Sequence, residues 1–490
     1  MNFTIRKSLL AVAVSGLLAA PLAHATNGYF MHGYSTKNKG LAGAGAAFSQ
    51  DAMAAAVNPA GMAFVGKRVD LGLQIFSPSP RSYTVTGNPI PAGTPLNFLC
   101  QGSQATPITA ANIPCGGFSI ATGTVESEND YFLIPHGAVN WILSDKATAG
   151  LAVYGNGGMN TEYTGGSATT LVPGASPAIL EVAYAPGTYG AGTAGVNLEQ
   201  MFFNFNSSYK LSAKHALGGS LIVVGQRFRA QGVQSFGGYS LDPAHMSGNV
   251  NSLSWGLGAK VGYQGEVAEG VRVGISYQSK ISMGEFDEYK GLFAEGGDFD
   301  IPSTYTLGVS FDVGKTGVIV ADYQRINYTD VASLSNPISN LTGGGCLDTL
   351  NGAIFQGTYP ASLPSSPPAS GATCLGGPDG AGFGWEDIGI LKLGFQWTAA
   401  NIDWRVGYSH SDQPIPDSET LFNILAPAVI QDHITGGMTL PVGKSQEFNL
   451  SLMYALENSV KGDNPFDGGA TQIEITMSQI DVQAGWAWKF

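Results

Sequence analysis

The chain has 490 residues, of which 44% are hydrophobic and only 12% are charged, about half the charged share of an ordinary soluble protein. Its net charge of −13 and the absence of any Lys/Arg cluster exclude nucleic acid as a partner. After residue 25 no apolar run approaches the roughly 18 residues that a transmembrane helix needs, which excludes a helical membrane protein.

The first 25 residues have the pattern of a secretory signal peptide. Arg6 and Lys7 precede an apolar run over residues 9–20, and a small-x-small motif ends at Ala25. We therefore expect cleavage after Ala25 and export of the rest of the chain.

Residues 26–66 are rich in Ala and Gly and show no strand alternation. The segment ends in a turn signal, in which Pro59 fixes its own φ and biases Asn58 towards an extended conformation. We interpret it as a hatch of short helices and turns, anchored at Asn58, Pro59 and Ala60.

From residue 67 to residue 490 apolar and polar residues alternate, which places successive side chains on opposite faces of a sheet. Several of these runs have 12 residues or more, longer than an ordinary strand. The strand candidates are 67–85, 129–143, 147–163, 196–211, 215–233, 251–266, 270–286, 299–313, 316–330, 386–398, 401–412, 430–442, 446–461 and 471–490.

Short turns and long Gly/Pro/Ser-rich loops alternate between these runs, and the last run ends in an aromatic residue, Phe490. This pattern is typical of an outer-membrane β-barrel, here an all-β antiparallel barrel of 14 strands with both termini in the periplasm. A barrel of that size leaves an open lumen unless something fills it, so we expect the hatch to plug it. The terminal Phe490 resembles the signal that the barrel-assembly machinery recognises.

Two close cysteine pairs lie in the long loops. Export permits disulfides, and we predict Cys100–Cys115 and Cys346–Cys374. Free thiols or a metal site are the alternatives, although no His or acidic residue is interleaved at ligand spacing. No metal or cofactor is expected.

Several motifs together resemble the FadL-like family of outer-membrane long-chain fatty acid transporters, which includes channels for aromatic hydrocarbons. The motifs are Gly40-Leu41-Ala42-Gly43-Ala44-Gly45, Asp51-Ala52, Asn58-Pro59-Ala60-Gly61, Ile301-Pro302-Ser303-Thr304-Tyr305-Thr306-Leu307-Gly308, Trp385-Glu386-Asp387, Trp404-Arg405-Val406-Gly407-Tyr408-Ser409 and Pro414-Ile415-Pro416-Asp417. The resemblance implies a 14-stranded barrel with a hatch. It also implies capture of a hydrophobic substrate by outer loops, an interior pocket, and lateral exit where the third strand kinks.

A glycine-rich run interrupts the third strand candidate, where consecutive glycines favour a bulge. It consists of Gly155, Asn156, Gly157 and Gly158. We predict the lateral opening here; a strand end entering its loop is the alternative.

Apolar residues in two outer loops are candidates for substrate capture, with loop-on-loop packing as the alternative. They are Leu292, Phe293, Leu421, Phe422, Ile424 and Leu425. For a carboxylate substrate, Arg227 and Arg229 are the candidate contacts to the head group, Arg227 by its loose match to a basic position of the family. A pairing of both arginines with lumenal acids is the alternative. The second basic position of the family, before Trp385, has no counterpart, which leaves a neutral hydrocarbon possible.

The sequence thus predicts a monomeric outer-membrane channel, embedded in outer-membrane lipid, for passive uptake of hydrophobic small molecules. Long-chain fatty acids are the first expectation, and aromatic or alkane hydrocarbons are the alternative. An outer-membrane barrel enzyme such as a phospholipase, or a general porin, is a more distant possibility. His136, His215, His410 and His433 show no distinctive nucleophile pattern, so we expect no catalytic site.

Overall fold

The computed structural model describes residues 27–94, 118–173, 180–342, 346 and 371–490. The predicted signal peptide and the predicted Cys100–Cys115 disulfide lie outside these residues.

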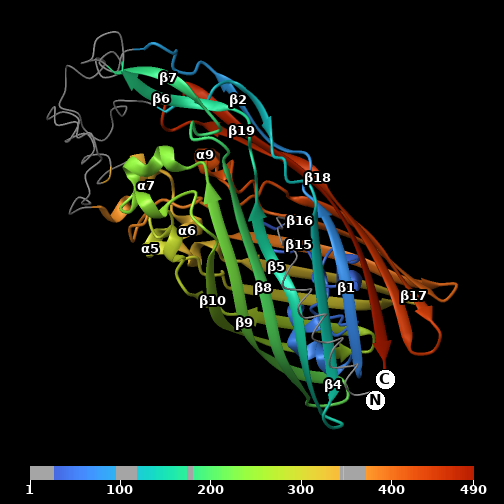
Figure 1. The fold of residues 1–490 in the computed structure, drawn as a ribbon. Helices are drawn as coiled ribbons and strands as arrows, with labels where there is room; N and C mark the ends of the chain where they lie inside the picture. The colour runs from blue at the N-terminus through green and yellow to red at the C-terminus, as the bar shows by residue number, and fades with distance from the viewer. Residues whose placement is uncertain (1–26, 95–117, 174–179, 343–345, 347–370) are drawn as a thin grey trace, which may run out of the picture.

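Fourteen antiparallel strands close into a barrel, as the sequence predicts (Figure 1). Every strand pairs with the next around the wall, and β1 closes the circle by pairing with both β19 and β4. In order around the wall the strands are β1 (Arg68–Ser77), β4 (Phe132–Ile142), β5 (Ala147–Asn160), β8 (Gly195–Lys210), β9 (His215–Gln231), β10 (Ser252–Ala268), β11 (Val271–Gln278), β13 (Thr304–Val313), β14 (Gly317–Ile326), β15 (Ile388–Ala399), β16 (Ile402–Ser411), β17 (Asp432–Val442), β18 (Gln446–Asp463) and β19 (Thr471–Lys489).

The wall is apolar outside and largely polar inside. Leu253, Trp255 and Leu257 of β10 are 60–68% exposed on the outer face, whereas Ser254 and Lys260 of the same strand are buried inside. This is the reverse of a soluble sandwich and is the pattern of barrels that span a bilayer. Among the described residues, no helix is long and apolar enough to cross a membrane.

At one end of the barrel the strands are joined by long segments that carry additional elements. β2 (Arg81–Gly87), β3 (Gly123–Glu126) and β12 (Ser282–Met283) extend the wall, and β6 (Ser167–Pro173) pairs with β7 (Leu180–Pro186) in a separate hairpin that the sequence did not indicate. The short helices of this end are η2 (Gln234–Tyr239), η3 (Pro243–His245), η4 (Asp287–Tyr289), α5 (Ala294–Gly297), η5 (Tyr328–Asp330), α6 (Ala332–Ser335), α7 (Ser339–Thr342), η6 (Gly371–Thr373), η7 (Asp417–Glu419) and α9 (Thr420–Asn423). The predicted Cys346–Cys374 disulfide is present at this long-loop end.

The hatch lies inside the barrel and contains α2 (Thr36–Lys39), α3 (Ala54–Val57) and η1 (Pro59–Ala63). Asn58 anchors it: its Nδ2 donates to the carbonyl oxygens of Ala46 (2.8 Å) and Tyr263 (2.9 Å), and its Oδ1 accepts from the Ala60 N–H (3.1 Å). The wall approaches so closely that a Cβ on Gly218 would lie 2.3 Å from the Ala60 nitrogen. The hatch therefore fits against this part of the wall only because a glycine stands there.

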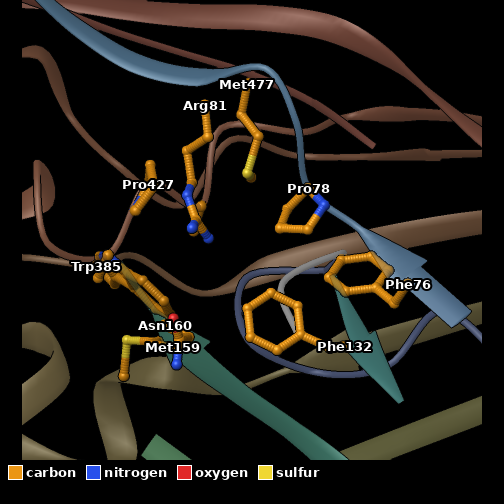
Figure 2. A pocket seen from close by; sticks show the side chains of 11 residues that line it. Phe76, Pro78, Arg81, Phe132, Met159, Asn160, Trp385, Pro427 and Met477 are labelled. Atoms are coloured by element: carbon orange, nitrogen blue, oxygen red, sulfur yellow. The ribbon is translucent and has the colours of Figure 1, made fainter. Parts of the chain in front are cut away.

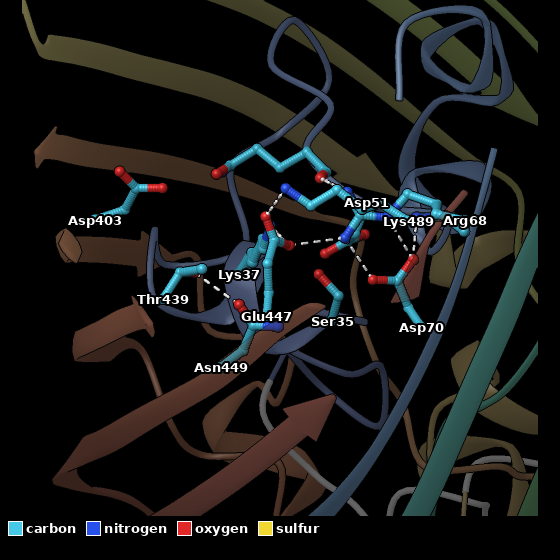
Figure 3. A network of polar contacts seen from close by, with 12 residues as sticks. Ser35, Lys37, Asp51, Arg68, Asp70, Asp403, Thr439, Glu447, Asn449 and Lys489 are labelled. Carbon is cyan, nitrogen blue, oxygen red and sulfur yellow. Dashed lines mark hydrogen bonds and ion pairs between the residues drawn. The ribbon is translucent and has the colours of Figure 1, made fainter. Parts of the chain in front are cut away.

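Buried ion pairs join the hatch to the inner wall (Figure 3). Lys37 of the hatch contacts Glu447 of the wall at 2.7 Å, and Arg68 of the wall holds the same carboxylate at 3.1 Å. Lys39 pairs with Asp481 at 2.5 Å where both side chains are almost completely buried. Because removing one partner of a buried pair leaves an uncompensated charge, these contacts fix the position of the hatch.

Candidate functional site

An apolar cavity of about 40 Å³ lies among the loops at the long-loop end, and we call it the outer pocket. Four of the predicted capture residues line it: Leu292, Phe293, Phe422 and Leu425. The other two, Leu421 and Ile424, are fully buried in the core beside it. The two predicted loops therefore converge on one cavity, and no charged residue of the described part of the chain lines it.

The rings that form the outer pocket pack against one another from distant parts of the chain. Phe228 of β9 lies 4.7 Å from Phe293 between ring centroids, and Phe236 lies edge-on to Phe422 at 5.1 Å. These contacts preorganise an apolar surface that can receive an oily molecule with few polar groups to desolvate.

The wall has a gap between β4 and β5, which we call the window. Pairing of these strands ends at Gly137 and Val153. Beyond that point β4 and β5 no longer pair with each other. Of the described wall strands, β4 then pairs with β1 over Phe132 to His136, and β5 pairs with β8 up to Asn160. A side-chain bond of 2.7 Å between Asn129 and Asn160 bounds the window at the long-loop end.

The predicted glycine run bends β5 away from β4. The register with β8 shifts between Gly155 and Gly158, where β5 has one residue more than its partner. Such a bulge bends a strand and increases its local twist. The strand therefore continues through the run instead of ending at it, and its bend lies at the window.

The first described residues of the hatch close the window from inside. Met31 N–H donates to the Asn156 carbonyl oxygen at 2.7 Å, and Gly158 N–H donates to the Tyr29 carbonyl oxygen at 3.1 Å. Tyr34 Oη also donates to Asn156 Oδ1 at 3.0 Å. A Cβ on Gly157 would lie 1.6 Å from the Tyr29 oxygen, so this contact requires glycine.

A second, smaller cavity of about 10 Å³ lies beside the window, and we call it the side pocket (Figure 2). Phe132 begins β4 and Met159 lies near the end of β5, so both strands that border the window contribute to it. Phe76, Trp385 and Met477 add apolar surface, and Arg81 contributes a positive charge to the lining. The side pocket and the outer pocket adjoin along the chain, because Ala426 lines the first and Leu425 the second.

The structure corrects the expectation for Arg227 and Arg229. Alternation along β9 turns Phe228 and Ala230 inward and places both arginines on the outer face, on the side of exposed Leu221. They line a polar cavity of about 250 Å³, which shares Asn160 with the side pocket and Val196 with the outer pocket. There Arg227 donates to both carboxylate oxygens of Glu199 at 2.6 and 2.7 Å. Neither side chain faces the lumen, so the prediction of an interior head-group contact is wrong.

A serine between two histidines lies inside the barrel. Ser409 Oγ is 2.7 Å from His32 Nε2 and 3.3 Å from His433 Nδ1, and the two rings stack at 4.3 Å. All three side chains are almost completely buried, His32 in the hatch and Ser409 and His433 on the wall. The group therefore forms part of the contact between hatch and wall.

Two features of the site were missed in the sequence. The segment from Tyr29 to Met31 lies directly against the bulge, and nothing in its pattern indicates a partner. Arg81 follows the Pro78-Ser79-Pro80 break between β1 and β2, and this break could have indicated that the strand is interrupted there.

No family model and no curated protein matches the chain. Solved structures do match it: the P. putida toluene transporter TodX (16% identity, 94% of this chain and 99% of that chain, TM-score 0.61) and a Pseudomonas aeruginosa FadL homologue (15%, 94% and 100%, TM-score 0.58). The Ralstonia pickettii toluene transporter TbuX also matches (16%, 94% and 99%, TM-score 0.53). At these identities the comparison shows a shared fold, which is the FadL-like fold that the sequence predicts.

Proposed function

We propose that this protein is an outer-membrane channel of the FadL-like family for passive uptake of hydrophobic compounds, with long-chain fatty acids as the first candidates. The observation that carries the proposal is the window between β4 and β5, which lies beside an apolar pocket and is closed by the hatch instead of by strand pairing. Substrate enters the outer pocket, passes to the side pocket and leaves sideways through the window into the bilayer.

A lateral exit suits the chemistry of an oily substrate. Each buried CH₂ contributes about 0.8 kcal/mol, so moving a long acyl chain into a water-filled lumen would cost many kcal/mol. A route from one apolar pocket to another and then to lipid avoids that barrier. The polar, hatch-filled lumen below the window offers no comparable path.

A neutral hydrocarbon is the second candidate substrate. The residues described around the outer pocket include no charged one, and the solved neighbours include proteins described as toluene transporters. Binding in the outer pocket therefore does not require an acidic head group, and an aromatic or alkane hydrocarbon could follow the same route.

The remaining expectations complete the proposal. The long-loop end faces the outside, and both termini face the periplasm. The start of β1 and the end of β19 lie side by side, because Arg68 is opposite Lys489 in the register of these two strands. In this orientation, that end of the barrel is the periplasmic one. The barrel-assembly machinery recognises the terminal Phe490, and the assembled protein is a monomer in outer-membrane lipid. Catalysis forms no part of the proposal.

The outer pocket can be tested with one substitution. Leu425 is 6% exposed and lines the cavity, so Leu425→Gln places an amide in it and should reduce uptake of labelled palmitate or toluene severalfold. The measurement is initial uptake by cells whose own channel for the compound is deleted.

Val250→Gln is the control, because Val250 is 72% exposed and lies outside the pocket. Equal uptake by both variants and the unaltered protein would contradict a role of the outer pocket in capture.

A further inference from the structure

Arg81 is a buried cation without an acidic partner in the described part of the chain. Its side chain is among the buried charged groups of the barrel, and Asp130 acts on it only through space. An unpaired guanidinium is costly to remove from water, so a buried one normally meets an anion or a full set of acceptors.

The hydrogen bonds of Arg81 leave part of its guanidinium free. Nη2 donates to Ser127 Oγ at 2.8 Å and to the Asn129 carbonyl oxygen at 3.0 Å. Nε is buried and has no hydrogen-bond partner. Tyr163, whose hydroxyl interacts electrostatically with Arg81, also has a buried oxygen without a partner.

The guanidinium of Arg81 points into the side pocket. Figure 2 shows the nitrogen atoms of Arg81 directed towards the space between Trp385, Phe132 and Pro427. A cation surrounded by apolar side chains matches a ligand that is apolar along its length and anionic at one end.

We propose that Arg81 binds the carboxylate of an amphiphilic ligand in the side pocket while the apolar part of the ligand lies along the route to the window. The inference rests on the proposed uptake function and names the chemistry that the side pocket selects. A carboxylate presents two oxygens to the planar guanidinium, which suits arginine better than lysine. The cavity of about 10 Å³ has room for about one water, so the head group binds when the lining side chains move apart.

The test compares an acid with its neutral ester. Binding of palmitate and of methyl palmitate to the purified protein is measured for the unaltered chain and for Arg81→Gln, which keeps donors for Ser127 and Asn129 but removes the charge. The affinity for palmitate should fall about tenfold or more, as expected for loss of a charge-assisted hydrogen bond, while that for the ester changes less than twofold.

Two further variants support the interpretation. Arg81→Lys keeps the charge without the planar fork and should bind palmitate with intermediate affinity. Arg229→Gln is the matched control, because Arg229 lies outside the wall, and it should bind both ligands as the unaltered protein does. Heat-modifiable migration in gel electrophoresis checks that each barrel is folded; if Arg81→Gln does not fold, Arg81→Lys alone must show the acid-selective loss.

The possible outcomes separate the two proposals. Unchanged palmitate binding, or equal losses for acid and ester, would overturn the role of Arg81 and leave uptake of hydrophobic compounds intact. Failure of the unaltered protein to bind either ligand would overturn the proposed function together with this inference.

Discussion

Asn58 shows how one side chain holds the hatch in place. Its amide makes the three hydrogen bonds described above, to Ala46, Tyr263 and Ala60, and the Tyr263 bond reaches the wall. A buried hydrogen bond contributes about 1 kcal/mol, and an unsatisfied buried group costs more.

Asn58→Ala should therefore weaken hatch seating by about 2–3 kcal/mol and reduce uptake severalfold, while the amount of folded barrel stays nearly constant because the strand ladder is untouched. Uptake and heat-modifiable migration measure the two effects. Asn340→Ala removes a loop bond to the Asp379 carbonyl oxygen and serves as the control. Uptake equal in all three proteins would mean that Asn58 does not anchor a functional hatch.

Residue roles could be predicted where the residue type itself restricts the backbone or its partners. That condition predicted the local backbone at Asn58 and the bulge in the glycine run, while the lateral opening at the run stays a prediction. Arg227 and Arg229 do not meet it, because a loose match to a family position does not determine which face of a strand a side chain is on. Leu217 and Leu221 share their parity on β9 and are exposed outward, which already indicated the outer face.

At the scale of elements, the hatch and the wall meet around buried histidines. Burial lowers the pKa of His32 well below its ordinary value of 6.5, and the nearby His433, Lys392 and Lys39 lower it further. As the pH falls, His32 binds a proton at a higher pH when the hatch is displaced than when the hatch is seated. The contribution of a neutral His32 to seating is therefore complete above pH 6.5 and decreases as the pH falls below it.

We therefore expect the free energy that holds the hatch in its seated position to decrease by up to about 1.4 kcal/mol for each pH unit below the ordinary histidine pKa. Single-channel recording in planar bilayers should show more frequent conducting events at pH 5 than at pH 7.5, by about tenfold or more. His32→Gln retains a polar partner for Ser409 but cannot titrate, and it should show a weaker dependence on pH. An identical dependence in the variant would exclude His32 as the group responsible.

At the scale of the whole molecule, the barrel could be predicted because each strand repeats the same physical constraint. Lipid outside and water or hatch inside impose alternation over every strand, and closure requires all strands to pair. The hairpin of β6 and β7 and the helices among the loops were not predicted, because no long periodic pattern marks these short elements. The role of Arg81 was not predicted either, because much of the side pocket around it is formed by β4, β5 and loop segments that are distant from it in the chain.

The central claim is lateral exit, and the bulge in β5 offers its most direct test. Deleting Gly157 removes the extra residue between Gly155 and Gly158, and should restore one-to-one pairing with β8 and straighten the strand at the window. Deleting Glu457 is the matched control, because it removes the extra residue of a similar bulge in β18, between Ala455 and Asn458.

The measurement is palmitate uptake by cells alongside palmitate binding by the same purified protein. The account predicts that deletion of Gly157 reduces uptake at least tenfold while binding changes less than twofold, and that deletion of Glu457 changes neither. Uptake at the rate of the unaltered protein after deletion of Gly157, with binding intact, would contradict exit through this window.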